Sequence, residues 1–314
     1  MRCCILLIAL ALLFRTAPLN GQSEPGRLLV PADSLHAGRL AFVAGAWTTL
    51  YGLTLYGLNE YWYAEYERGA FHFFNDGAEW LQMDKAGHVY TAYFESRWTM
   101  RALQWSGLQP AAAAWAGALT GFLFQTSIEW MDGYSAAWGA SLWDVAANAA
   151  GSAVMLSQEL MWKQQRLCLK MSAWPGRYPA SLQHRSNLLF GQLPERLLKD
   201  YNHQTYWLSV NPASFCSRSP QWLPPWLNIA VGYGADGMMG GYANLWEEEG
   251  EQMDYSFLPR QRQYYLSLDA DLTRLPVKSP LLKTVFEIVN VIKIPAPALL
   301  LQPGQGLAVD WLAF

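Results

Sequence analysis

The sequence predicts a mainly α fold, in which a membrane-associated bundle of three to four helices precedes a mixed, loop-rich portion with a few strands. Charged residues make up only 15% of the 314 residues, against roughly 25% in an average soluble domain. The 16 Trp and 16 Tyr suit a chain that meets lipid headgroups. Residues 35–165 are apolar and rich in Ala and Gly, whereas residues 170–314 mix Pro, Gly and Asn with short apolar runs. We therefore expect a helical bundle at 35–165 and a mixed α/β portion at 170–314 that packs on it.

Residues 1–22 have the pattern of a secretory signal peptide. Arg2 supplies the positive start, and the apolar core from Ile5 to Phe14 is too short to span the ~30 Å of bilayer hydrocarbon. This pattern predicts export from the cytoplasm.

The cysteines add little to this prediction. Cys3 and Cys4 precede the apolar core, so they would leave with the signal and cannot form a lipid-attachment box at its end. Cys168 and Cys216 could pair in an oxidising compartment, or both could remain free thiols.

The first helix of the bundle is predicted at residues 40–59, which carry no charge and are about long enough to span a bilayer. An aromatic collar follows at residues 59–74, as expected at a membrane–water boundary. The helix after His88 contains Glu95 and two arginines, so we expect it to be tilted, interfacial or buried against its neighbours. A soluble, Ala-rich bundle is the alternative.

Two further helices are predicted from a proline and from small residues. Pro110 should lie in the first turn of a helix, because a proline is tolerated there. Gly117 and Gly121 in this helix, and Gly151 in a helix at residues 141–162, would let neighbouring helices approach closely.

Beyond residue 170 the sequence predicts a strand at 205–210 and a second strand at 264–272. In the second strand, Leu266 and Leu268 alternate with polar residues, which is the pattern of a half-buried strand. Residues 280–294 are strongly apolar and predict a helix.

Polar residues interrupt the apolar helices at helical spacings. Asp84 and His88 are four positions apart, as are Asp144 and Asn148, so each pair shares one helix face. Ionisable groups on such helices are costly to bury and normally find partners in the bundle interior. We therefore predict that three helices direct these groups to one centre, a binding site formed by Asp84, Lys85, His88, Glu129, Asp132, Ser141, Asp144 and Asn148.

Helix capping is the alternative explanation for part of this set. Asp84 could cap the N-terminus of one helix, and Ser141 could open a capping box on another. Asp132 precedes a glycine, the usual helix terminator. Capping does not explain His88 or Glu129, so a shared site and a structural polar network both stay open.

Two chemistries fit this centre if it is a site. An oxygen-rich set with one imidazole could hold a divalent cation, with His88, Glu129, Asp132 and Asp144 as the candidate ligands. Alternatively, His88, Glu129 and Asp132 could supply a catalytic acid and base for a lipid-linked or cell-wall substrate. No other cofactor is predicted.

Other function classes lack support in the sequence. It contains no G-x-S-x-G, H-E-x-x-H or P-loop motif, so standard hydrolase and nucleotide-binding interpretations have no basis. The net charge of −3 and the absence of a Lys/Arg-rich run exclude an electrostatic argument for nucleic-acid binding.

The motifs DKAGH, EWMDG and SLWDVAANAAG resemble the order D-K-x-x-H, E, S-x-x-D-x-x-x-N-x-x-G of the YfiM-like family of predicted periplasmic lipoproteins of unknown function. VanZ-like membrane proteins are similar at a greater distance. The downstream sequence is similar to the long form of the YfiM-like family. The resemblance implies a helical core built around these polar residues and a location in the cell envelope of a Gram-negative-type bacterium. It implies no reaction, and the chain departs from the lipoprotein pattern because no cysteine follows its signal core.

The sequence thus predicts an envelope protein that is periplasmic or membrane-associated and has membrane lipid as its partner. The polar cluster would have a structural or binding role. The alternative is a metal-dependent or His/carboxylate enzyme that acts on envelope lipid or glycan substrates.

Overall fold

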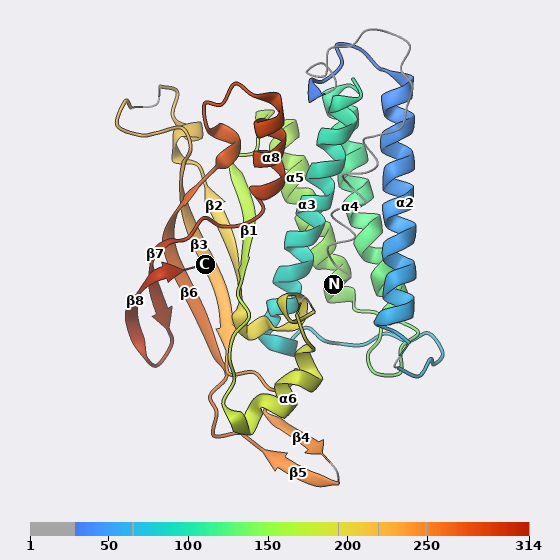
Figure 1. Ribbon diagram of the computed structural model, residues 1–314, viewed down its shortest axis with the longest axis vertical. Helices are drawn as coiled ribbons and strands as arrows, with labels where there is room; N and C mark the ends of the chain where they lie inside the picture. Colours follow the sequence, from blue (N-terminus) through green and yellow to red (C-terminus); the bar gives the residue numbers. More distant parts are fainter. Residues whose placement is uncertain (1–28, 65, 194, 219, 249, 314) are drawn as a thin grey trace.

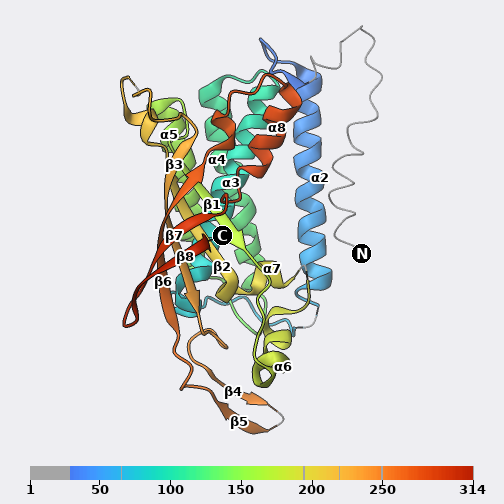
Figure 2. The same cartoon turned by 60° about the vertical axis from the view of Figure 1, so that its left-hand side comes forward.

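Helices and a sheet form two layers that lie side by side (Figures 1 and 2). The computed structural model describes residues 29–64, 66–193, 195–218, 220–248 and 250–313. The helical layer contains α2 (Ala37–Tyr61), α3 (Met83–Trp105), α4 (Pro110–Asp132) and α5 (Leu142–Trp162). The sheet layer is antiparallel and has the strand order β1-β2-β3-β6-β7-β8.

The sheet uses the chain from residue 167 to its end. Its strands are β1 (Leu167–Ala173), β2 (Gln204–Val210), β3 (Leu227–Asp236), β6 (Gln261–Ala270), β7 (Ala296–Gln302) and β8 (Gly306–Ala313). A separate hairpin of β4 (Leu245–Glu248) and β5 (Glu251–Asp254) projects at the lower end of Figure 1. The remaining α-helices are α6 (Ala180–Phe190), α7 (Arg196–Lys199) and α8 (Pro280–Val289), and a 3₁₀ segment, η3 (Glu79–Gln82), precedes α3.

The predicted mainly α fold is wrong, because a six-stranded sheet and not a loop-rich portion follows the helices. The strands predicted at 205–210 and 264–272 correspond to β2 and β6, and the predicted helix at 280–294 begins with α8. The prediction missed the other four strands of this sheet and both strands of the β4–β5 hairpin. β3 contains two glycines, which weaken strand propensity, and β7 contains a continuous apolar run without alternation.

The membrane span predicted at residues 40–59 is also corrected. Among the described residues, no helix combines the length and the apolar character needed to cross a membrane. α2 has 25 residues, but glycine, threonine and tyrosine interrupt its aliphatic positions. The signal peptide predicted at 1–22 lies outside the described residues. Cys168 and Cys216 are both free thiols, the first buried and the second exposed.

α3, α4 and α5 pack closely because small residues line the faces where they meet. Gly117 and Gly121 of α4 lie against the backbone of α3 around Ser96. A Cβ atom on Gly151 of α5 would lie 2.1 Å from the carbonyl oxygen of Val89 on α3. The predicted role of these glycines in close helix approach is confirmed.

The interior of this three-helix unit carries ionisable side chains. Glu95 of α3 accepts a hydrogen bond of 2.8 Å from Gln125 Nε2 of α4, while its second carboxylate oxygen is buried without a partner. Burial raises the pKa of Glu95 to about 8. Arg97 is 2% exposed and its Nη2 lies 3.0 Å from Glu287 Oε1 of α8, which ties the helical layer to the C-terminal half.

The sheet buries its polar face and exposes its apolar face. Lys170 Nζ of β1 lies 2.8 Å from Asp269 Oδ2 of β6, and both side chains are 0% exposed. On the opposite face Val231 and Leu266 are 51% and 48% exposed. β6 therefore has the predicted alternation, but its buried side is the polar one.

Replacing Gly151 with Ala should force α3 and α5 apart. We expect the free energy of unfolding to fall by about 1–3 kcal/mol, because the new methyl group meets backbone atoms that cannot rotate away. Thermal unfolding followed by circular dichroism measures the change. Gly45→Ala is the matched control, since a Cβ there meets nothing within 4 Å and alanine favours the helix. Equal effects of the two substitutions would contradict the packing explanation.

Replacing Glu95 with Gln should flatten the pH dependence of stability. With its pKa raised from 4.5 to about 8, folded Glu95 holds a proton that the unfolded chain has already released. The free energy of unfolding of the wild type should therefore fall as pH rises through this interval, by at most about 1.4 kcal/mol per pH unit. Denaturant titrations across the interval compare the two slopes, and identical slopes would show that Glu95 is ionised in the folded protein.

Candidate functional site

Three helix ends that carry acidic residues meet at one end of the bundle. Asp84 lies in the first turn of α3, Asp144 lies in the first turn of α5, and Glu129 lies in the last turn of α4. They border a cavity of about 540 Å³ that also has an aromatic wall and a lysine. Its lining includes Trp62, Tyr63, Tyr66, Phe74, Asp76, Glu79, Trp80, Asp84, His88, Glu129, Asp132, Trp138, Asp144, Lys199 and Tyr201.

Lys85 joins three carboxylates beside this cavity. Its Nζ lies 2.6 Å from Asp76 Oδ2, 2.8 Å from Asp84 Oδ2 and 2.6 Å from Asp144 Oδ1. Burial alone would lower the pKa of Lys85, but the charges of Asp84 and Asp144 raise it above its ordinary value. The lysine is therefore a charged cross-link between α3, α5 and the segment before α3.

His88 is oriented by an amide and faces carboxylates with its other nitrogen. Its Nδ1 lies 3.0 Å from Asn148 Oδ1 on α5, an acceptor, so Nδ1–H donates. Nε2 lies 3.6 Å from Glu129 Oε1 and 3.8 Å from both Asp84 Oδ1 and Asp144 Oδ1. These separations are too long for hydrogen bonds. The second imidazole nitrogen thus faces three acidic oxygens.

Glu129 is buried with one carboxylate oxygen unpaired. It is 3% exposed; Oε2 accepts a 3.1 Å hydrogen bond from the backbone N–H of Ser141, and Oε1 has no hydrogen-bond partner. Burial, and then the charges of Asp144 and Asp132, raise the pKa of Glu129 to about 9. Burial followed by the charge of Asp84 raises the pKa of Asp144 to about 7. The carboxyl groups around Glu129 therefore outnumber the basic side chains that could neutralise them.

Asp132 is set apart from the rest. It lines the same cavity, but its Oδ1 accepts hydrogen bonds from Tyr63 Oη at 2.7 Å and from Trp138 Nε1. Burial raises the pKa of Asp132 to about 6. The structure brings together the other seven predicted residues, and Asp76 joins them. We call these eight residues the polar cluster: Asp76, Asp84, Lys85, His88, Glu129, Ser141, Asp144 and Asn148.

The capping alternatives are partly corrected. Asp84 does not cap α3, because the N-cap residue is Gln82, and Asp84 instead accepts a 2.7 Å hydrogen bond from Tyr201 Oη. Ser141 is the N-cap of α5, as predicted, and its Oγ accepts from the N–H of Asp144. The capping box is incomplete, because the N–H of Ser141 donates to Glu129 and not to Asp144.

A left-handed turn fixes the start of α3. Trp80, Leu81 and Gln82 have φ angles of 48°, 51° and 64°, a conformation that costs on the order of 1 kcal/mol or more for each residue. The C-terminal half holds this turn: Arg262 Nη1 donates to Leu81 O at 3.0 Å, and its Nη2 donates to Gln82 Oε1 at 2.6 Å. The sheet therefore sets the position from which Asp84 and His88 project.

Sequence reasoning missed Asp76 and Tyr201. Asp76 is 7% exposed and its Oδ1 accepts from Ser141 Oγ at 2.5 Å. The turn-forming Asn-Asp-Gly sequence around it was the available signal. Tyr201 lies 117 positions beyond Asp84 and had no signal, since only the tertiary fold brings it there.

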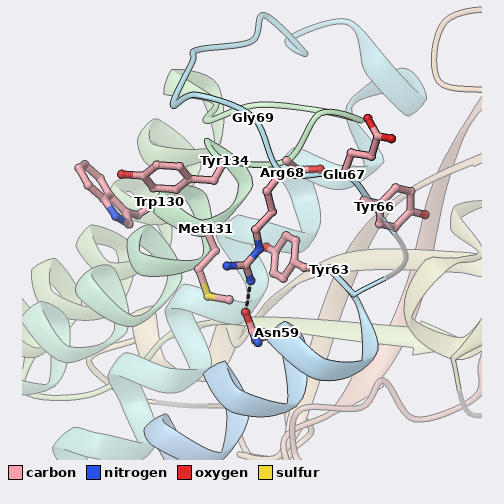
Figure 3. Close-up of a pocket in the computed structure, with 10 residues that line it drawn as sticks. Asn59, Tyr63, Tyr66, Glu67, Arg68, Gly69, Trp130, Met131 and Tyr134 are labelled. Atoms are coloured by element: carbon pink, nitrogen blue, oxygen red, sulfur yellow. Dashed lines mark hydrogen bonds between the residues drawn. The ribbon is translucent and has the colours of Figure 1, made fainter.

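A second cavity of about 390 Å³ adjoins the first, and Tyr63 and Tyr66 line both. Figure 3 shows Trp130 and Tyr134 on one side of it and Tyr63 and Arg68 on the other, with Arg68 hydrogen-bonded to Asn59. This second cavity is aromatic and carries no residue of the polar cluster.

Replacing Lys85 with Met should destabilise the fold strongly. Three carboxylates would lose their shared cation, and breaking a buried ion pair costs about 3–5 kcal/mol. Denaturant unfolding at neutral pH measures the loss. Lys278→Met, at an exposed position, should change the free energy of unfolding by less than about 0.5 kcal/mol. Similar values for both variants would contradict the cross-linking role of Lys85.

Comparison with protein families gives one match, and comparison with curated proteins and with solved structures gives none. Residues 72–158 match the family described as "Predicted periplasmic lipoprotein (DUF2279)". This segment includes α3, α4, most of α5 and every residue of the polar cluster. The similarity to VanZ-like proteins stays a prediction. The predicted resemblance to periplasmic lipoproteins of unknown function is confirmed for residues 72–158, and this match is consistent with a protein of the cell envelope, periplasmic or membrane-associated.

Proposed function

We propose that this envelope protein associates with the membrane and binds a divalent cation at the polar cluster, next to a cavity that admits an envelope lipid or glycan. The ligands are His88 Nε2 with carboxylate oxygens of Asp84, Asp144 and Glu129. Asp132, bonded to Tyr63 and Trp138, is not among them.

One observation carries the cation site. His88 Nε2 faces three acidic oxygens at 3.6–3.8 Å, and the Glu129 oxygen among them is buried without a hydrogen bond. Ionised carboxylates repel one another unless a positive charge lies between them. A cation at this point would satisfy all of them together.

The donor set suits a small transition-metal cation. One ligand atom each from Asp84, His88 and Asp144 lies within 4.8 Å of the others. Two ligand atoms that share a cation at about 2.1 Å lie about 3.0–3.4 Å apart, so the widest separations would shorten by about 1–2 Å when a cation binds. Imidazole with carboxylates favours Zn²⁺ or Mn²⁺ over Ca²⁺, which prefers oxygen ligands alone.

Surrounding groups support the ligands as they do in known metal sites. Asn148 fixes the His88 tautomer, Tyr201 orients Asp84, and the N–H of Ser141 holds the second oxygen of Glu129. Lys85 neutralises part of the acidic charge, which leaves an excess for a divalent ion.

The cavity suggests the class of ligand. Trp62, Tyr66, Phe74 and Trp80 give it an aromatic wall opposite the acidic residues, and sugar rings and lipid headgroups offer apolar faces with polar edges. A bound cation would polarise a carbonyl or phosphoryl oxygen of such a ligand. The enzymatic reaction that this arrangement would serve is metal-assisted hydrolysis.

A cation-free polar network is the second candidate. The raised pKa values of Glu129 and Asp144 favour it, because protons on these carboxyls also relieve the repulsion. In that case the cluster fixes helix packing and binds no metal.

Membrane association is supported by the surface of the helical layer. Large apolar side chains are exposed on its outer side, including Leu53 and Tyr56 of α2 and Trp115 and Leu119 of α4. Exposed apolar surface of this extent marks contact with lipid or with another protein.

Metal analysis of tag-free protein tests the cation site. After treatment with a chelator and dialysis against Zn²⁺ or Mn²⁺, we expect one cation per chain by mass spectrometry and a raised melting temperature. A gain of about 2.7 kcal/mol is expected at a cation concentration a hundred times the dissociation constant.

His88→Gln should abolish the binding, whereas His184→Gln is the control, since His184 is exposed and paired with Glu248 outside the cluster. Wild type that binds no cation, or a His88→Gln variant that binds as well as wild type, would contradict the cation site. If wild type binds no cation and Glu129→Ala is strongly destabilised, the cation-free polar network is the correct explanation.

A further inference from the structure

The exposed face of the sheet is the second unusual surface of the molecule. We infer that this outer face lies against the acyl chains of a lipid bilayer, an inference that rests on the membrane association proposed above and names the surface that carries it. The outer face is formed by Leu208 of β2, Ile229 and Val231 of β3, Leu266 and Leu268 of β6, and Leu299 and Leu301 of β7, all of them exposed.

The register of the strands makes this face continuous. Ile229 lies opposite Leu268, and Val231 lies opposite Leu266, in the pairing of β3 with β6. Leu266 in turn lies opposite Leu299 in the pairing of β6 with β7. Residues directly opposite each other in an antiparallel pair share a face, so their side chains form one surface.

The inner face of the same strands is buried and carries charged and polar side chains beside Trp207 and small residues. Asp269 Oδ2 accepts from Ser209 Oγ at 2.6 Å and pairs with Lys170 Nζ at 2.8 Å. Asn228 Nδ2 donates to Ser209 Oγ at 2.9 Å, and Lys293 Nζ lies 4.5 Å from the centre of the Trp207 ring. Burial lowers the pKa of Lys293 to about 8.

This polarity is the reverse of a sheet in water. Antiparallel sheets with one solvated face bury apolar residues and expose polar ones. Here the buried face carries two lysines and an aspartate, while Leu268 on the other face is 54% exposed. Strands that face lipid show this order, with apolar residues outward and polar residues inward.

Aromatic side chains mark both ends of the outer face. Tyr233 and Tyr264 lie opposite each other at one end, with ring centres 5.7 Å apart. Trp222 is exposed in the segment before β3, at the other end. Between Tyr233 and Leu227 on β3, the outward positions hold only Val231 and Ile229. Tyr and Trp concentrate where a membrane surface meets water.

Lipid explains the distribution better than a second copy of the chain. Exposed Leu53 of α2 and Leu119 of α4 belong to the helical layer, on the other side of the molecule from β6 and β7 (Figures 1 and 2). One protein partner seated on the sheet would leave them in water, whereas lipid can contact exposed apolar residues of both layers.

Flotation with phosphatidylethanolamine/phosphatidylglycerol vesicles tests the inference. We expect the wild type to float with the vesicles and Val231→Thr/Leu266→Thr/Leu268→Thr to lose about tenfold or more in partition coefficient. Threonine keeps strand propensity, and the substituted positions are exposed, so the variant should retain its fold. Leu188→Gln/Leu193→Gln/Leu198→Gln is the control, because these leucines are equally exposed but lie outside the sheet.

A fluorescent label checks the surface without relying on that variant. With other accessible cysteines replaced by serine, a bimane label on Leu266→Cys should be quenched by brominated phosphatidylcholine in the vesicles. The same label on Gln252→Cys of the β4–β5 hairpin should not be quenched.

The outcomes separate the two proposals. Wild type that stays at the bottom of the gradient overturns membrane association itself. Wild type that floats while the threonine variant floats equally and the Leu266→Cys label is not quenched overturns only the role of the sheet. Sedimentation could instead show a dimer that the threonine substitutions dissociate, with no binding to vesicles. That result would assign the face to a second copy of the chain and overturn the lipid assignment.

Discussion

The shortage of positive charge at the polar cluster is the constraint on which the rest of the structure depends. Four carboxyl groups converge there, from Asp76, Asp84, Glu129 and Asp144. Among the described residues, Lys85 pairs with three of them at 2.6–2.8 Å, and His88 Nε2 lies 3.6–3.8 Å from three. Protons or a cation must supply the remainder, because buried like charges cannot stand together unneutralised. The glycines between α3, α4 and α5 allow the three helices to approach closely enough for these groups to meet. Arg262, reaching from the sheet to Leu81 and Gln82, holds the start of α3 in a conformation that it would not adopt alone.

Both layers bury ionisable groups and expose large apolar side chains. In the helical layer Arg97 and Glu129 are buried while Leu53 and Trp115 are exposed. In the sheet Lys170 and Asp269 are buried while Val231 and Leu268 are exposed. A cation centre deep in such a molecule would face a cavity and not bulk water, and a ligand drawn from the membrane could reach it along an apolar surface. The envelope location fits this arrangement.

The sequence predicted the site more fully than the fold. Helical spacing placed Asp84 with His88 and Asp144 with Asn148, because side chains four residues apart share a face whatever the tertiary structure. Asp132 shows the limit of this reasoning, because residue spacing does not reveal that Tyr63 and Trp138 donate hydrogen bonds to its carboxylate. Strands such as β3 and β7 escaped prediction because two glycines weaken the strand signal in the first and a continuous apolar run hides alternation in the second. Tyr201 and the left-handed turn before α3 depend on contacts between distant segments, which no local pattern encodes.

Nitrogen NMR of the His88 side chain tests the central claim most directly. In protein labelled with ¹⁵N-histidine, the spectrum of His88→Gln assigns the His88 signals by their loss. We expect Nδ1 to carry a proton, and addition of ¹¹³Cd²⁺ should split the Nε2 signal by coupling to the metal. An Nε2 signal that does not respond to the cation would contradict the claim that this nitrogen, which faces three carboxylates, is a metal ligand.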